Sequence, residues 1–200
     1  MNCKSVLISI KPEWVEKILD GSKTIEIRKS MPKCKLPCKV YIYETKDKVL
    51  VGDHFERVNT IYFGGKATYR IKKDYYYGQG KVVAEFTLNK IDIIDIYDPT
   101  IWLDGQQFDI NEFENKCCLT ADNLMEYIGY GSEEKYSRGY AWYIDNLIVY
   151  DEPKWLNEFI KPANCNNKDF ETFDNNKAYY WKCLQKAPQS WCYVQTMEAV

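Results

Sequence analysis

The stretch "PEWVEKILDGSKTIEIRK", Pro12 to Lys29, combines a short helix, a stop signal and a strand. Proline suits the first turn of a helix, because its missing N–H has no partner there. Val15, Ile18 and Leu19 form one apolar stripe at helical spacing. Gly21 then provides the left-handed backbone that commonly ends a helix. The sequence therefore predicts a helix that leads directly into a strand.

The predicted strand, "TIEIR", alternates apolar and polar residues. Because successive side chains of a strand point to opposite faces, Ile25 and Ile27 are expected to face the core. Thr24, Glu26 and Arg28 then share the other face, with Glu26 and Arg28 about 7 Å apart along the strand.

This polar face has two interpretations. It is either a solvated surface whose ion pair contributes under ~1 kcal/mol, or the wall of a cleft beside the helix. In a cleft, Arg28 would bind a phosphate or a base edge and Lys23 would supply a point charge. Glu26 would orient Arg28 or accept a proton. The alternation alone does not choose between the two.

The rest of the chain contains many predicted strands and few helices. A helix is predicted at 121–128, with Thr120 as its cap and Gly129 as its end, and another at 151–159, opened by a proline. The segment 74–81 is predicted to be a connection and 164–177 a polar loop. Strands are predicted at 4–10, 39–45, 66–72, 81–90 and within 139–150. This pattern predicts an α+β fold with a mainly antiparallel sheet curled toward a barrel.

Composition limits the classes of function. Hydrophobic residues make up 46% of the chain, which disfavours global disorder, and the net charge of -2 restricts any nucleic-acid site to a local basic patch. The start lacks a secretion signal, and no run approaches the ~20 apolar residues of a membrane span, so a cytoplasmic location is expected. No membrane partner is therefore predicted.

The eight cysteines are accordingly expected to be reduced thiols. Cys34 and Cys38, with the adjacent Cys117 and Cys118, make poor zinc-binding pairs, and His54 is the single histidine. The acidic residues Asp92, Asp95 and Asp98 alternate with isoleucine, as at a strand edge and turn. We predict no metal site and no cofactor.

The segment "IKPEWVEKILDGSKTIEIRKSMP" resembles the opening of the ASCH family, a branch of the PUA-like β-barrels, in its bacterial and phage-borne form. The family signature falls on Gly21, Lys23, Glu26 and Arg28. The stretches "GKVVAEFTL", "GYAWYIDNLIVYDEPKWLNEF" and "APQSWCYV" are also similar to family segments. The resemblance implies a PUA-like domain over residues 1–160, with an insertion around 52–80, and a C-terminal extension, 161–200, that packs back on the barrel.

The resemblance also implies a partner. PUA-like domains are associated with RNA or modified bases, so the expected ligand is RNA or a modified nucleotide or nucleoside. A small ASCH branch is similar to amidohydrolases of N4-acetylcytidine, which use the signature Lys and Thr with a Glu from elsewhere. This sequence keeps Lys23 but has Glu26 where that Thr stands, with Thr24 displaced along the strand. A Glu does not replace a hydroxyl nucleophile.

The function expected from this resemblance is RNA or nucleotide binding in the cleft beside the first helix. The alternatives are hydrolysis of N4-acylated cytidine or of RNA in the same cleft, with Lys23 and Glu26 as catalytic residues, or a protein-interaction module. In the last case a surface of Tyr75, Tyr76 and Tyr77 would matter, although a strand end is the simpler interpretation. The expected ligand-binding residues are Lys11, Lys23, Thr24, Glu26, Arg28 and Tyr143.

Two tryptophans have expected places in this fold. Trp142 precedes Tyr143 in a predicted strand, so the two side chains point oppositely and Trp142 belongs in the core. Trp191 either packs the C-terminal segment onto the barrel or closes one side of the cleft.

Overall fold

The computed structural model describes residues 5–58, 68–97, 100–130, 136–162 and 181–196. Three α-helices, α1 (Pro12–Leu19), α2 (Ile110–Cys117) and α3 (Ala121–Ile128), and a 3-10 turn, η1 (Leu156–Glu158), accompany a large amount of strand. The strands are β1 (Ser5–Ile10), β2 (Ile25–Arg28), β3 (Cys38–Glu44), β4 (Lys48–Val58), β5 (Thr68–Tyr77), β6 (Val82–Tyr97), β7 (Thr100–Leu103), β8 (Tyr136–Lys154), β9 (Phe159–Pro162), β10 (Trp181–Cys183) and β11 (Trp191–Thr196).

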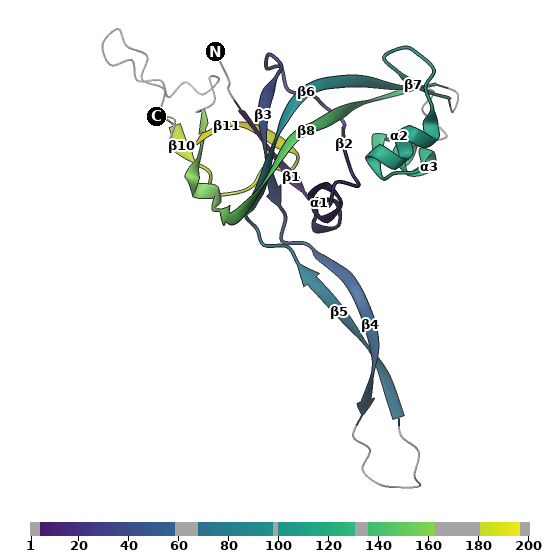
Figure 1. Cartoon of the computed structure of the whole chain (residues 1–200), viewed down its shortest axis with the longest axis vertical. Helices are drawn as coiled ribbons and strands as arrows, with labels where there is room; N and C mark the ends of the chain where they lie inside the picture. The colour runs from purple at the N-terminus through teal and green to yellow at the C-terminus, as the bar shows by residue number, and fades with distance from the viewer. Residues whose placement is uncertain (1–4, 59–67, 98–99, 131–135, 163–180, 197–200) are drawn as a thin grey trace.

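A nine-stranded mixed sheet forms the body of the molecule, in the order β10-β9-β11-β1-β3-β6-β8-β2, with β7 paired to β6 (Figure 1). Strands β1 and β3 run parallel, and the other described pairs of this sheet are antiparallel. The predicted α+β class is therefore confirmed. Closure into a barrel is not, because β10 and β2, both short, end the sheet without pairing to each other among the described residues.

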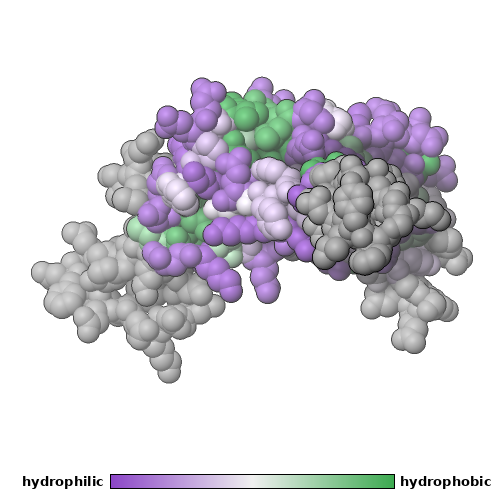
Figure 2. Space-filling model, turned by 90° about the horizontal axis from the view of Figure 1, so that it is seen from below, coloured by the Kyte–Doolittle hydropathy of each residue, from purple (hydrophilic) through white to green (hydrophobic). Residues whose placement is uncertain are grey.

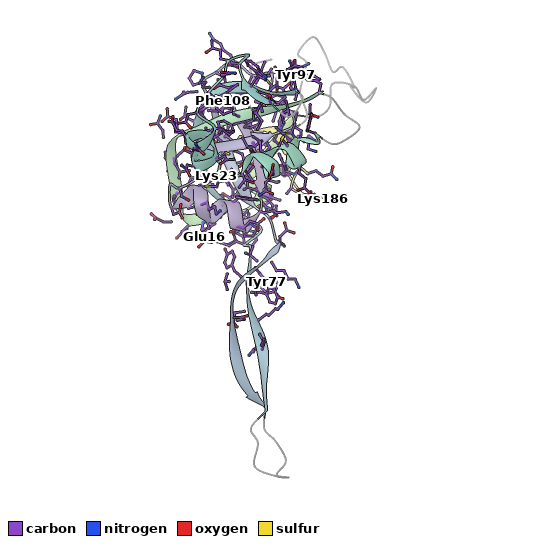
Figure 3. The ribbon with its side chains drawn as sticks, turned by 90° about the vertical axis from the view of Figure 1, so that its right-hand side faces the viewer. Glu16, Lys23, Tyr77, Tyr97, Phe108 and Lys186 are labelled. Carbon is purple, nitrogen blue, oxygen red and sulfur yellow. The ribbon has the colours of Figure 1, made fainter. Side chains whose placement is uncertain are left out.

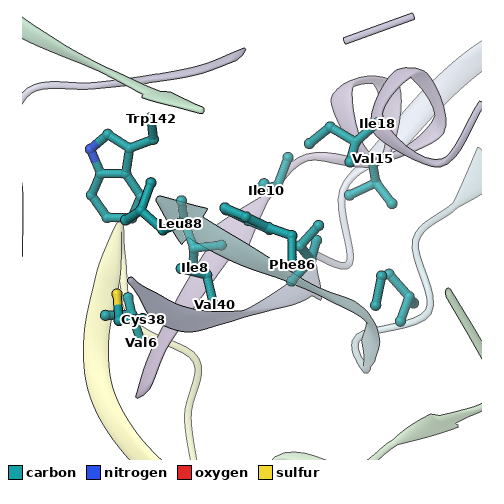
Figure 4. Close-up of a cluster of buried hydrophobic side chains, with 13 residues drawn as sticks. Val6, Ile8, Ile10, Val15, Ile18, Cys38, Val40, Phe86, Leu88 and Trp142 are labelled. Atoms are coloured by element: carbon teal, nitrogen blue, oxygen red, sulfur yellow. The ribbon is translucent and has the colours of Figure 1, made fainter. Parts of the chain in front are cut away.

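Helix α1 covers one end of this sheet and completes the main core (Figure 4). Val15 and Ile18 of the helix are buried with Ile10 of β1 and Phe86 of β6. Trp142 of β8 is fully buried in the same cluster, which confirms its predicted place in the core. Burying a large apolar side chain stabilises a fold by ~1.5–3 kcal/mol, so α1 is held against the sheet by its predicted apolar stripe.

A two-stranded hairpin of β4 and β5 leaves the body and forms a separate sheet (Figure 1). It covers most of the segment predicted as an insertion. The connection predicted at 74–81 is shorter than expected, because residues 74–77 continue β5 and pair with β4. Its turn is tight at Gly78, where an added Cβ would lie 1.8 Å from the carbonyl oxygen of Thr45.

The predicted helix at 121–128 is confirmed as α3. Its first turn is capped by Thr120, whose hydroxyl accepts a hydrogen bond from the Asn123 N–H at 3.3 Å, and Gly129 ends it at φ +98°. The helix predicted at 151–159 is wrong. Strand β8 continues through Pro153, near the strand end where a missing N–H costs little, and only the short η1 turn follows.

Helix α2 was not predicted, and the polar loop predicted at 164–177 lies outside the described residues. The C-terminal strand β11 pairs antiparallel with β1. Among the described helices, none has the length and apolar character needed to span a bilayer.

Candidate functional site

A pocket of about 480 Å³ opens beside α1, where several parts of the chain meet. Ser9 contributes from the end of β1 and Trp14 from α1. Tyr127 contributes from α3, and the loop before β11 brings Pro188 and Gln189. The floor comes from the Lys23–Arg28 segment, so the helix–strand unit of the opening sequence builds the centre of the pocket. The volume lies within the ~300–1,000 Å³ usual for small-molecule sites.

Three charged side chains form a buried ion triplet at this floor. Glu26 forms ion pairs with both neighbours: Arg28 Nη2 lies 3.0 Å from its Oε1, and Lys23 Nζ lies 3.3 Å from its Oε2. All three residues are buried, with exposed fractions of 7% or less. One carboxylate between two cations leaves a local net charge of +1. The cleft interpretation of this strand face therefore describes the structure, and the solvated-surface interpretation does not.

Lys23 is fixed by more than its ion pair. Its Nζ donates to the carbonyl oxygen of Cys117, at the end of α2, at 2.6 Å, and it lies 5.3 Å from the centre of the Trp14 ring. The backbone N–H of Lys23 donates to the Lys17 carbonyl at 2.7 Å across the Gly21 turn. The helix end and the turn thus direct this ammonium into the protein rather than into solvent.

Arg28 is only partly satisfied by the protein. Its Nη2 donates to the carbonyl oxygen of Ser9 at 2.8 Å, whereas its Nε is buried and has no hydrogen-bond partner among the described residues. Tyr127 interacts with Arg28 from α3, and burial raises the pKa of its phenol above its usual value. A buried donor without a partner is costly, by ~1–3 kcal/mol, and such groups in a pocket commonly face a ligand.

The pocket brings together four of the six predicted ligand-binding residues. Lys23, Glu26 and Arg28 line it, and the exposed Lys11 lies at its rim, next to the start of α1. Thr24 is exposed and lies outside the lining. Its N–H donates to the Lys116 carbonyl at 2.8 Å, which ties the strand to α2.

Tyr143 is the other predicted residue that does not reach the pocket. It pairs with Ile25 across β2 and β8, so its side chain lies on the Ile25 face of the sheet. There it packs against a second buried apolar cluster, which contains Ile25 and Phe113. Its hydroxyl donates to Asp92 Oδ2 at 2.7 Å. Burial and this hydrogen bond raise the pKa of Tyr143 far above its usual value. Tyr143 was expected to line the cleft, but its side chain lies on the opposite face of β8.

Several lining residues were not anticipated as site residues, namely Ser9, Trp14, Tyr127, Pro188 and Gln189. The sequence did contain a hint for Trp14, because it lies one helical turn before Ile18 on the predicted helix. Trp191 does not line the pocket: its Nε1 donates to Ser30 Oγ at 3.0 Å and its ring lies 6.0 Å from that of Trp142. The residues just before it, Pro188 and Gln189, close that side instead.

The described residues contain no group of three His, Cys, Asp or Glu side chains placed to hold a metal ion. Six cysteines lie in the described part of the chain, namely Cys34, Cys38, Cys117, Cys118, Cys183 and Cys192, and Cys3 and Cys165 lie outside it. Cys117 is buried, which raises the pKa of its thiol and keeps it protonated. Its carbonyl, not its sulfur, serves the site by holding Lys23.

Comparisons with known proteins converge on one family. The ASCH domain model matches residues 8–154. Among solved structures, ASCH from Zymomonas mobilis aligns with a TM-score of 0.47 and 17% identity, covering 98% of this chain and 92% of that one. Two single-substitution variants of the Zymomonas mobilis protein align with TM-scores of 0.45 and 0.43, each at 16% identity. They cover 99% and 98% of this chain and 93% and 94% of theirs. No curated protein matches.

Proposed function

The chain belongs to the ASCH domain family, and on this premise we propose that it binds RNA or a nucleotide, with an anionic group of the ligand held in the pocket beside α1. Lys23 and Arg28 supply the positive charge of the floor, Glu26 orients both cations, and Lys11 adds a contact at the rim. Trp14 and Tyr127 offer aromatic surface to a base.

The observation that carries this proposal is the unsatisfied guanidinium. Arg28 is buried next to a pocket, its Nε has no partner among the described residues, and the triplet around it has a charge of +1. A planar guanidinium with a free donor suits a phosphate oxygen or an acceptor on a base edge. An anion bound in the pocket would neutralise the triplet.

Hydrolysis in the same pocket is the weaker candidate. Both oxygens of Glu26 are held by cations, Oε1 by Arg28 and Oε2 by Lys23, so this carboxylate is arranged to position charges rather than to take a proton. Lys23 is likewise engaged, by Glu26 and by the Cys117 carbonyl. Neither side chain resembles an activated nucleophile with an adjacent free base.

The test is a direct binding measurement with Arg28→Lys. This substitution keeps the charge but removes the fork and its Nε donor, so we expect nucleotide affinity to fall about tenfold, as for one lost charge-assisted hydrogen bond. Affinity for a mononucleotide is measured by calorimetry at low salt, and thermal unfolding verifies that the variant is folded. Lys35→Ala, an exposed lysine ahead of β3, is the matched control and should bind like the native protein.

Two results would contradict the proposal. One is native protein without measurable affinity for RNA, nucleotides or modified nucleosides at low salt. The other is Arg28→Lys that binds as tightly as the native protein. Turnover of N4-acetylcytidine or RNA that falls about a hundredfold in Glu26→Gln would instead favour the hydrolase.

A further inference from the structure

A second groove, of about 570 Å³, lies next to the proposed binding pocket. Its walls come from the end of β3, the η1 turn and the segment before β11. Trp155, Lys46 and Lys186 line it, and among the described residues its lining includes no carboxylate. We call it the Trp155 groove. Its chemistry combines an aromatic platform with positive charge.

The Trp155 groove adjoins the first pocket at two places along the chain. Thr45 lines both depressions. Its neighbour Lys46 lines the groove while Asp47 lines the pocket. On the opposite wall, Ala187 lines the groove and the next residue, Pro188, lines the pocket. A chain-like ligand that leaves the pocket on this side therefore enters the Trp155 groove directly.

Trp155 is presented for stacking. The residue is 58% exposed, which is unusual for a tryptophan, and Lys81 Nζ lies 4.2 Å from the ring centre. The ring is thus supported by a cation and still offers apolar surface to solvent. Base–aromatic stacking tolerates any sequence, because every base has a π-face. Lysines at the edge of such a platform suit the phosphates between stacked bases.

The position of Lys46 is constrained as well. Gly80 adopts φ +67°, and an added Cβ there would lie 2.3 Å from Lys46 Cε. The aliphatic stem of Lys46 therefore lies along the Gly80 backbone. Lys186 projects from the segment before β11 on the other wall.

A third depression, of about 720 Å³ between α1 and the hairpin, has the opposite charge. Its lining includes Glu13, Glu16, Asp20 and Glu44. In Figure 3, Glu16 and Lys186 lie toward opposite sides of the body. A polyanion in the pocket is therefore repelled on the α1–hairpin side and attracted on the Trp155 side.

We propose that the ligand is single-stranded RNA of at least two nucleotides, which places one nucleotide in the pocket and stacks the next base on Trp155. This inference rests on the proposed function and specifies its substrate class. A free mononucleotide would fill only the first pocket, and its affinity would not depend on the Trp155 groove.

The experiment compares a mononucleotide with the corresponding dinucleotide and tetranucleotide RNA in the same calorimetric assay. We expect the tetranucleotide to bind at least about tenfold more tightly than the mononucleotide. Trp155→Ala should weaken tetranucleotide binding at least about fivefold, the loss of one stacked base, and leave mononucleotide binding unchanged. Trp155→Phe should retain most of the affinity. Lys46→Ala should also weaken only the longer ligands, and Lys35→Ala should change neither.

The possible outcomes distinguish a failure of the Trp155 subsite from a failure of ligand binding in the first pocket. Equal affinity for the mononucleotide and the tetranucleotide, or an unchanged tetranucleotide affinity in Trp155→Ala, overturns the Trp155 subsite while pocket binding stands. Absence of binding by every ligand overturns both. Weaker tetranucleotide binding alone in Trp155→Ala, together with about tenfold weaker binding of every ligand in Arg28→Lys, supports both.

Discussion

Glu26 shows how a single residue can look like surface in the sequence and be central in the structure. Its alternation with Ile25 and Ile27 assigns it to the polar face of β2, and the resemblance to ASCH sequences drew attention to the same position. Burial of that face depends on α3 and on the loop before β11, which are far away in the sequence. The sequence therefore predicted that Lys23, Glu26 and Arg28 act together, but it did not predict that all three side chains would be buried.

We expect Glu26→Gln to destabilise the fold by about 3 kcal/mol, because it leaves Lys23 and Arg28 buried without their shared counter-charge. Glu112→Gln is a matched control: its pair with Lys116 spans 2.6 Å on the exposed face of α2. Such a surface pair contributes under about 0.5 kcal/mol. Urea unfolding of the two variants gives the comparison. Equal losses would mean that the triplet adds no more than a surface pair.

Tyr143 gives a prediction about alkaline pH. Its pKa is raised in the folded protein, first by burial and then by its hydrogen bond to Asp92. Above about pH 10 the unfolded chain releases this proton and the folded chain keeps it, so stability should fall as pH rises. Tyr143→Phe should be less stable at neutral pH but lose less stability between neutral and alkaline pH. Urea unfolding across that range tests the slope, and parallel curves would contradict the assignment.

At the scale of elements, the sequence predicted a helix correctly where the signals for its start, its apolar face and its end were all present. Helices α1 and α3 had an apolar stripe, a first-turn signal and a terminal glycine, and both were predicted. Helix α2 has an Asp109 cap, whose carboxylate accepts from the Asn111 N–H at 2.9 Å, but just two buried residues, Phe113 and Cys117. Strand β4 was missed because it pairs only with β5, outside the core that gives strands their alternating pattern.

The β4–β5 hairpin should be dispensable for the fold. It forms its own sheet and shares no ladder with the nine-stranded body. Replacing residues 48–77 by a short flexible linker should keep the body folded and mononucleotide binding intact, since Thr45 and Asp47 are retained. One contact that is lost is that of Tyr76, whose hydroxyl lies 3.1 Å from both oxygens of Glu44, and the contacts of β4 with α1 are lost with it. Circular dichroism and calorimetry test this, and an unfolded product would show that the hairpin supports the body.

A second element-scale prediction concerns the turn that returns the hairpin to the body. Gly78 lies so close to the Thr45 carbonyl that Gly78→Ala cannot be accommodated without moving the backbone. We expect it to destabilise the protein by about 1–3 kcal/mol. Gly52→Ala is the control, because an added Cβ at that position meets nothing within 4 Å. If both variants unfold at the same denaturant concentration, the close approach at Gly78 is not a constraint.

At the scale of the whole molecule, a nearly neutral chain separates its charges. The surface seen in Figure 2 is mostly hydrophilic with small apolar areas, so no large apolar face dominates that side. Although the net charge is only -2, the charges are unevenly distributed. Acidic residues line the depression beside the hairpin, and lysines line the groove on the other side of the pocket. Composition predicted that any nucleic-acid site would be a local patch. It could not predict which segments form it, because Lys46 and Lys186 are brought together only by the tertiary fold.

Salt dependence tests this separation of charge across the whole surface. Each phosphate contact on a single strand contributes about −0.7 to the slope of log affinity against log salt. Lys186→Ala should therefore make the slope for tetranucleotide RNA shallower by about 0.7, because one counterion-releasing contact is lost. Glu16→Gln changes charge by the same amount in the acidic depression, which the strand avoids, so its slope should match that of the native protein. The slopes come from affinities measured over a series of salt concentrations. If Glu16→Gln altered the slope as much as Lys186→Ala, the strand would not be confined to the Trp155 side, and the path of RNA over the molecule would have to include the acidic depression between α1 and the hairpin.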